Sequence, residues 1–204
     1  MKKQVVIIHG GDAYTSYERY IESLKGEELD IQDLRQDNNM WRRTLGSNLG
    51  PDFEVIAPKM PCQQNAKYAE WKIWFDKLVP QLNDEVILIG HSLGGIFLAK
   101  YLSENKFPKK IRATFLVAPP YDDGTDGDPI ADFSLTERLN LFAEQGGEIR
   151  IYHSSDDQIV DDSDLKAYQK ALPMAKPVLF SDKGHFIIKE FPEIVKDIRD
   201  IFAS

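Results

Sequence analysis

Short runs of apolar, mostly β-branched residues recur along the chain and are separated by polar or glycine-containing stretches. Brief runs that are apolar throughout are typical of strands buried on both faces of a sheet. Other stretches repeat their apolar positions every three to four residues, as amphipathic helices do. Strands are expected at residues 4–8, 53–57, 85–89, 111–117, 148–152 and 177–180. Helices are expected at residues 14–24, 67–82, 93–104, 134–145, 164–171 and 192–202.

The alternation of strand and helix predicts the fold class. Strands joined through helices pair in parallel by right-handed crossovers, and the helices cover both faces of the sheet. We therefore expect an α/β protein, a three-layer α/β/α sandwich with a mainly parallel six-stranded sheet. The length of 204 residues fits a single domain spanning residues 1–204.

Two connections are longer than this scheme requires. Residues 26–51 contain enough apolar positions to predict one or two additional helices, and residues 118–132 carry five aspartates without a lysine or arginine. Long connections in compact domains often act as lids or binding loops, so residues 26–51 and 118–146 are candidate lid elements. The alternative for the acidic segment is a solvated surface loop.

Charge and cysteine content argue against several classes of partner. The 25 basic and 33 acidic residues give a net charge of −8, which argues against a nucleic-acid-binding protein. The apolar run at residues 5–8 is too short for a signal peptide, and no run is long enough to span a membrane, so we expect a soluble protein. The single cysteine, Cys62, excludes an internal disulfide, which favours the cytoplasm, and is expected to be a partly buried small apolar residue.

The string Gly-His-Ser-Leu-Gly-Gly at residues 90–95 follows a predicted strand directly and opens a predicted helix. A sharp strand-to-helix turn exposes a serine hydroxyl above the sheet, and glycines two residues to either side allow the turn to close. The new helix also offers unpaired N–H groups to a developing negative charge. The context predicts that Ser92 is a nucleophile, and the alternative is an ordinary glycine-rich connection.

A serine nucleophile needs a base and a group that orients the base. His185 lies on the loop after the last predicted strand, from which it can reach across the carboxyl edge of the sheet, so we expect it to be the base. His91 adjoins the serine and projects along a diverging direction, and His153 ends a strand. No histidine of the sequence stands at the spacing of a metal-binding motif. We therefore expect no metal and no cofactor.

Two aspartates, Asp156 and Asp157, follow the strand that should neighbour the histidine loop. Residues 90–94, the Asp-x-x-Val of residues 157–160 and Gly-His at residues 184–185 together resemble the α/β-hydrolase superfamily pattern. That resemblance selects Asp157 as the acid and leaves Asp156 as a turn residue. The chain order of serine, aspartate and histidine is the order of that fold.

An oxyanion formed by attack of the serine needs hydrogen-bond donors. The geometry of the turn predicts the N–H of Leu93 as one donor. The loop after the first strand, residues 9–12, resembles the His-Gly-x oxyanion loop of the same superfamily. The resemblance implies Gly11 as the second donor, with Asp12 as the alternative.

The resemblance narrows further to small serine hydrolases of the retinoblastoma-binding type and their bacterial relatives. Here the oxyanion strand is the first strand, whereas full α/β hydrolases have two strands before it, so the resemblance implies a truncated fold. Residues 58–61 and the helix carrying Trp71 and Trp74 also resemble that branch. Asp161 departs from it, because the superfamily often has proline there.

The resemblance implies a serine hydrolase, and carboxylic ester hydrolysis through an acyl-enzyme is the expected reaction. Alternatives are a thioesterase, a peptidase or a cofactor-free oxidase-like enzyme using the same triad, or a non-enzymatic protein-interaction module. The expected partner is a small-molecule ester, and the sequence gives no support for a protein partner.

Acidic side chains should gather at the mouth of the site. Five aspartates lie in residues 121–132 and five more in residues 156–164, and both segments should flank the carboxyl edge. This predicts a preference for neutral or cationic esters. Tyr121, Phe133 or Trp41 are candidate walls of the substrate pocket, and the alternative for the first two is ordinary packing.

Overall fold

A six-stranded sheet forms the centre of the computed structural model, which describes residues 2–28, 40–122, 130–135 and 138–203. The strand order is β2-β1-β3-β4-β5-β6, and every neighbouring pair is parallel. The periodicity predicts all six strands to within two residues at either end. The strands are β1 (Lys3–Ile8), β2 (Phe53–Ile56), β3 (Val86–His91), β4 (Ile111–Val117), β5 (Glu148–Ser154) and β6 (Lys176–Phe180).

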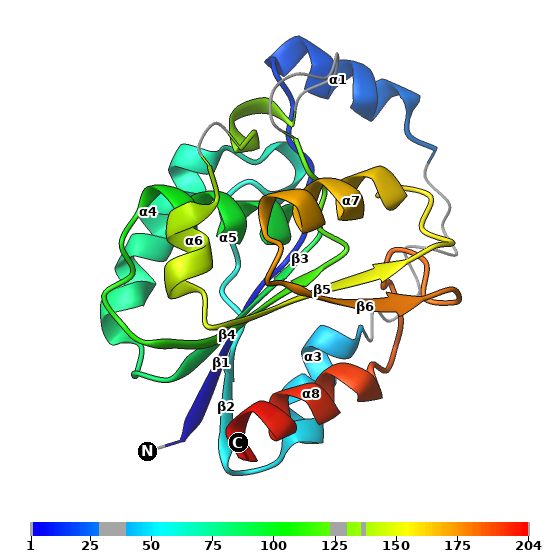
Figure 1. Ribbon diagram of the computed structural model, residues 1–204. Coiled ribbons are helices and arrows are strands. Elements are labelled where there is room, and N and C mark those ends of the chain that lie inside the picture. The colour runs from blue at the N-terminus through cyan, green and yellow to red at the C-terminus, as the bar shows by residue number, and fades with distance from the viewer. Residues whose placement is uncertain (1, 29–39, 123–129, 136–137, 204) are drawn as a thin grey trace.

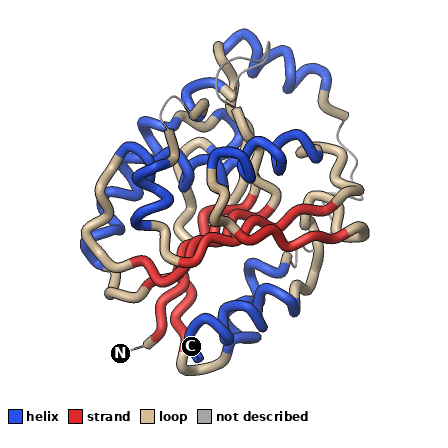
Figure 2. Tube along the Cα trace, viewed as in Figure 1, coloured by secondary structure: helices blue, strands red, loops and turns tan. Residues whose placement is uncertain are grey.

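Helices cover both faces of the sheet, which is drawn in red in Figure 2, and confirm the expected α/β sandwich. One face carries α4 (Tyr68–Leu78), α5 (Leu93–Glu104), α6 (Asn140–Gln145) and α7 (Asp162–Ala171). The other carries α3 (Trp41–Leu49) and α8 (Pro192–Ala203), which lie side by side in Figure 1. Two separate apolar cores fill the spaces between sheet and helices.

The remaining helical elements are short or peripheral. The helix α1 (Tyr17–Gly26) begins where the Ser16 hydroxyl accepts a hydrogen bond from the N–H of Arg19, 3.2 Å away. Single 3-10 turns occur at η1 (Gln63–Asn65), η2 (Val79–Gln81) and η3 (Ala131–Phe133). Helix α6 begins later than the predicted residue 134, and α3 is a helix of the kind expected within residues 26–51.

The topology determines where a site can form. All strands run in the same direction, so their carboxyl ends meet at one edge, and the chain changes its winding direction between β1 and β3. In open parallel sheets, ligands bind at such a switch point. The loop after β1 and the turn after β3 therefore lie together at the place where a ligand is expected.

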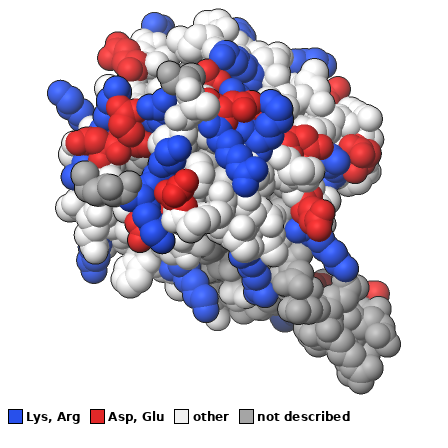
Figure 3. Space-filling model, turned by 90° about the horizontal axis from the view of Figure 1, so that it is seen from below, with Lys and Arg blue, Asp and Glu red and all other residues white. Residues whose placement is uncertain are grey.

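Charged residues are mixed rather than segregated on the face seen from below, where Lys and Arg alternate with Asp and Glu (Figure 3). Ion pairs form near the strand starts, such as Arg112 with Glu85 at 3.0 Å and Lys176 with Glu148 at 2.8 Å. Cys62 is exposed rather than partly buried. Within the part of the chain that the structure describes, no helix combines the length and apolar character needed to cross a bilayer.

Candidate active site

Ser92 lies in a sharp turn between β3 and α5 with backbone angles of φ 54° and ψ −125°. Its N–H donates to the carbonyl of Val117 at the end of β4, 2.9 Å away, and its own carbonyl accepts from Gly95 N–H at 2.7 Å. A Cβ at Gly90 would lie 2.3 Å from the carbonyl oxygen of Gly94, so this turn needs glycine there. The expected strand-turn-helix context of the serine is therefore present.

His185 and Asp157 face each other across the same edge of the sheet. The Nδ1 of His185 lies 2.8 Å from Oδ2 of Asp157, whose side chain is fully buried. The other carboxylate oxygen accepts the N–H groups of Ile159 at 2.8 Å and Val160 at 3.1 Å, which fixes its orientation. Because a carboxylate only accepts, Nδ1 carries the proton and Nε2 is left with a lone pair, as a general base requires.

The turn at Ser92 and the loop of His185 are linked through His91. The Nε2 of His91 donates to the carbonyl of His185 at 2.8 Å, and the two imidazole rings lie 5.2 Å apart between centroids. Asp156 anchors the same loop, because its carboxylate accepts the hydroxyl of Ser154 and the N–H of Gly184. The structure thus brings Asp157 and His185 into contact and links their loop to the turn of Ser92 through His91.

The two other histidines have structural partners. Nδ1 of His9 donates to the carbonyl of Gly10 at 2.6 Å, and Nε2 accepts the N–H of Met60 at 2.9 Å. Burial lowers the pKa of His9, which keeps this ring neutral. His153 lies 2.8 Å from a carboxylate oxygen of Asp162. These contacts agree with the expectation that neither ring is the base.

The loop after β1 lies directly against the serine. A Cβ on Gly10 would lie 3.0 Å from Cβ of Ser92, and one on Gly11 would lie 2.5 Å from the carbonyl oxygen of Gln63. Leu93 is the first residue of α5, where an N–H has no acceptor within the helix. The N–H of Asp12 donates to the Gln63 carbonyl at 2.9 Å, so this alternative donor is already engaged in the fold.

A cavity of about 240 Å³ opens beside Ser92. Asp12 is the charged residue among the described residues that line it, and burial, with a smaller effect of Glu27, raises the pKa of its carboxyl group. Its apolar lining includes Ile130, Ile159 and Val160. The full lining is Gly11, Asp12, Ala13, Tyr14, Ser92, Leu93, Pro120, Ile130, Ile159 and Val160.

The aromatic residues considered as pocket walls lie elsewhere. Phe133 is fully buried against Trp71, with ring centroids 5.3 Å apart, and Tyr121 packs edge-on against Tyr168 at 4.9 Å. Trp41 is buried beneath the His185 loop. Ordinary packing, the alternative for Tyr121 and Phe133, therefore describes both residues.

Several aspartates of the two acidic segments, residues 121–132 and 156–164, accept hydrogen bonds from backbone N–H groups of the fold. Asp161 caps α7 in a reciprocal capping box with Asp164, and Asp164 also accepts the N–H of Tyr121 at 2.6 Å. This capping role accounts for the aspartate at the position where the superfamily often has proline. Asp122 is buried and accepts the hydroxyl of Ser134 at 2.6 Å. Asp123, Asp126 and Asp128 lie outside the described residues.

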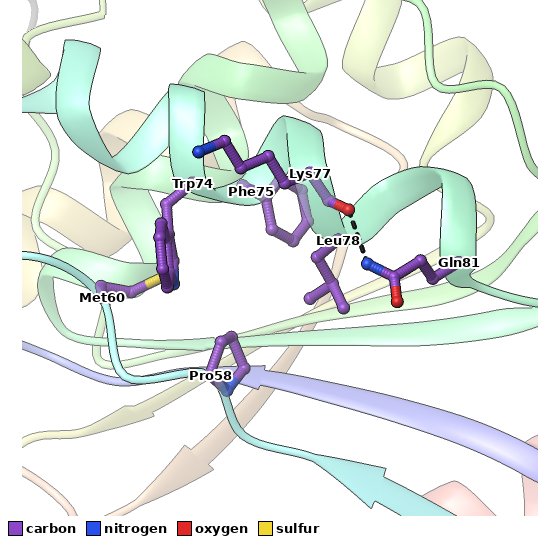
Figure 4. Close-up of a pocket in the computed structure, with 7 residues that line it drawn as sticks. All are labelled: Pro58, Met60, Trp74, Phe75, Lys77, Leu78 and Gln81. Atoms are coloured by element: carbon purple, nitrogen blue, oxygen red, sulfur yellow. Dashed lines mark hydrogen bonds between the residues drawn. The ribbon is translucent and has the colours of Figure 1, made fainter.

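A second cavity, of about 280 Å³, lies between α4 and the segment after β2 (Figure 4). Its walls are largely apolar, and the Nζ of Lys77 lies 5.5 Å from the ring centre of Trp74 at its rim. It shares no lining residue with the cavity beside Ser92. Its lining consists of Pro58, Met60, Trp74, Phe75, Lys77, Leu78 and Gln81.

Comparison with known proteins gives consistent results. A family model described as serine hydrolase matches residues 35–194. The serine hydrolase RBBP9 of Rattus norvegicus is 25% identical over 155 residues, which are 75% of this chain and 80% of that protein. The ydeN gene product of B. subtilis superposes with a TM-score of 0.73 at 18% identity over 100% of both chains. A YdeN-like hydrolase from Pectobacterium atrosepticum gives 0.66 at 15% identity, covering 98% of this chain and 90% of the other.

Proposed function

Because this chain belongs to the serine hydrolase family, we propose that it hydrolyses carboxylic esters through an acyl-enzyme on Ser92. The observation that carries this proposal is the 2.8 Å hydrogen bond between His185 and Asp157, placed at the same sheet edge as the serine turn. The bond leaves Nε2 of the imidazole as a proton acceptor. A buried, fully hydrogen-bonded carboxylate also stabilises the imidazolium formed when the serine loses its proton.

The reaction follows from these roles. The Oγ of Ser92 attacks the ester carbonyl carbon while Nε2 of His185 takes the hydroxyl proton. The carbon–oxygen bond to the alcohol then breaks, and His185 returns the proton to the leaving oxygen. Water, activated by the same imidazole, attacks the acyl-enzyme and releases the carboxylic acid and the free serine.

The tetrahedral intermediate carries a negative oxygen that needs donors at fixed positions. The N–H groups of Leu93 and Gly11 serve this purpose in the proposal, since one starts a helix and the other lies on the loop packed against the serine. Removal of one such donor typically raises the barrier by about 2.7–4 kcal/mol.

The cavity beside Ser92 supports small, uncharged acyl groups as the preferred substrates. Its volume of about 240 Å³ and its mainly apolar lining suit a short aliphatic or small aromatic group. Asp12 adds a carboxyl group to the lining, so a substrate carboxylate would meet like charge there. Neutral or cationic esters are therefore the proposed substrate class.

Labelling and turnover test the proposal together. The wild-type protein should react with a fluorophosphonate probe and hydrolyse p-nitrophenyl acetate and butyrate faster than long-chain esters. Ser92→Ala should abolish labelling and lower turnover by at least about 10³-fold while the circular dichroism spectrum stays unchanged. Labelling that survives in Ser92→Ala overturns the assignment of the nucleophile.

The same assay separates the alternatives. Matched thioesters, run beside the esters, identify a thioesterase if their kcat/KM is higher by tenfold or more. A wild-type protein that neither binds the probe covalently nor turns over any ester favours the non-enzymatic interaction module.

A further inference from the structure

Three backbone carbonyls of the loop that carries His185 accept hydrogen bonds from outside the loop. The Nε2 of His91 donates to the carbonyl of His185 at 2.8 Å. Trp41, the first residue of α3, donates twice: its indole Nε1 to Phe186 at 3.1 Å and its backbone N–H to Ile188 at 3.0 Å. The start of α3 and the end of β3 therefore hold this loop from two sides.

The protonation state of His91 follows from its two partners. A carbonyl oxygen only accepts hydrogen bonds. Nε2 of His91 therefore carries a proton and donates it in a hydrogen bond to the backbone carbonyl of His185. A guanidinium only donates, so Nδ1 of the same ring accepts from Arg42, with which it is in close contact. His91 is almost completely buried, and this burial, reinforced by the charge of Arg42, lowers its pKa to about 3. The ring is thus neutral and held as one tautomer.

Arg42 has few other interactions. Its guanidinium also contacts the sulfur of Met40 at 3.3 Å, and it forms no ion pair with any carboxylate of the described residues. An arginine on an ordinary surface helix would be solvated or paired with an acid. Here it is directed at an imidazole that in turn holds the backbone of His185.

We propose that Arg42 and His91 are positioning residues for the base. Arg42 selects the tautomer of His91 that donates to the His185 carbonyl, and this bond sets the place of the His185 ring relative to Ser92. The inference rests on the proposed function, because it concerns the residue proposed as the base. It gives α3, in the long connection between α1 and β2, a role in organising the site.

The size of the expected effect follows from the sensitivity of proton transfer to geometry. A displacement of about 1 Å at a reacting group can lower a rate by about 10²-fold. Loss of the His91 hydrogen bond moves the base but leaves the substrate cavity intact. The structure therefore predicts a lower kcat with little change in KM.

The test compares two variants with two matched controls. His91→Phe keeps an aromatic ring but loses both hydrogen bonds, and it should lower kcat by about 10–100-fold with KM within threefold of wild type. Arg42→Met should lower kcat by about 3–30-fold. His153→Phe removes another buried, hydrogen-bonded histidine, and Arg199→Met frees the carbonyls of Asn48 and Leu49 at the opposite end of α3. Both controls should keep kcat within twofold.

Rescue and a spectroscopic signal separate positioning from general stability. His91→Gln retains a side-chain N–H at nearly the same reach and should restore most of the lost kcat. The proton NMR signal of the Nδ1–H shared by His185 and Asp157 should shift or broaden in His91→Phe and Arg42→Met, and should stay in place in both controls. Each variant is measured at a temperature at which circular dichroism shows it folded.

The outcomes are distinct. Folded Arg42→Met or His91→Phe proteins with wild-type kcat and an unmoved NMR signal overturn the inference, and Arg42→Met alone decides if His91→Phe does not fold. A wild-type protein that is inactive toward every ester, combined with a signal that still moves in the variants, overturns the proposed function and supports the positioning role.

Discussion

Asp157 and His185 are 28 residues apart in the chain, yet their side chains are 2.8 Å apart. Each follows one of two neighbouring parallel strands, β5 and β6, whose pairing ends at Ser154 and Phe180. The sheet therefore sets the distance between these two side chains, which are the proposed acid and base, and local turns only adjust it. Each of the following predictions tests one consequence of this arrangement.

Asp157→Asn should lower kcat by about 10³–10⁴-fold with little change in fold. The amide no longer favours the tautomer in which Nδ1 carries the proton, and it does not stabilise the imidazolium. Steady-state kinetics with a chromogenic ester measures the effect. Asp156→Asn is the matched control: it weakens the anchor on Gly184 and should cost less than tenfold. Equal losses in the two variants contradict the choice of Asp157.

Gly90→Ala should destabilise the protein by more than about 3 kcal/mol, because the new Cβ meets backbone atoms of Gly94 that cannot swing away. Urea denaturation followed by tryptophan fluorescence measures the loss. Gly46→Ala, within α3, offers a comparison, since its Cβ would lie 3.6 Å from the nearest atom, on Val55. That variant should be neutral or gain up to about 1 kcal/mol from helix propensity. A Gly90→Ala protein as stable as wild type contradicts the tight turn.

Stability should depend on pH through His91. The pKa of this ring is about 3 in the folded protein and about 6.5 in the unfolded chain. Between these values the unfolded chain binds a proton that the native state does not bind. The free energy of unfolding therefore falls as the pH falls from 6.5 toward 3, with a slope approaching about 1.4 kcal/mol per pH unit for this group. His91→Gln should show a shallower slope in urea titrations between pH 6 and pH 4, and an unchanged slope rules out this contribution.

Asp12 should influence which substrate charge is preferred. Because its carboxyl group lines the cavity beside Ser92, Asp12→Asn should raise kcat/KM for a carboxylate-bearing ester relative to a matched neutral ester, by about 3–10-fold at low salt. Asp52→Asn, an exposed change beside the start of β2, should leave the ratio unchanged. If both variants behave alike, Asp12 does not contribute to discrimination.

Much of the fold is predictable from the sequence because the sheet is buried on both faces. Strands such as β3 consist almost entirely of apolar residues, and no alternating pattern competes with that signal. The start of α6 is less predictable. Ser134, expected to begin this helix, instead donates its hydroxyl to Asp122, a partner that periodicity does not reveal.

In the candidate site, too, some residues can be predicted from the sequence and others cannot. Ser92 and His185 stand in short glycine-containing motifs that can be recognised from the sequence, at residues 90–94 and 184–185. Phe133 is different, because an apolar residue that lines a pocket and one that fills a core look alike in sequence. Arg42 stands 49 residues before its partner His91, in a segment without a motif, so only the packing of α3 on the sheet reveals their contact.

The positive φ angle of Ser92 carries a thermodynamic consequence. Glycine adopts such a conformation freely, whereas a residue with a Cβ is disfavoured there by about 1–3 kcal/mol. The chain thus gives up stability at the residue proposed as the nucleophile. Glycine at position 92 would therefore be expected to raise the free energy of unfolding while removing the proposed nucleophile.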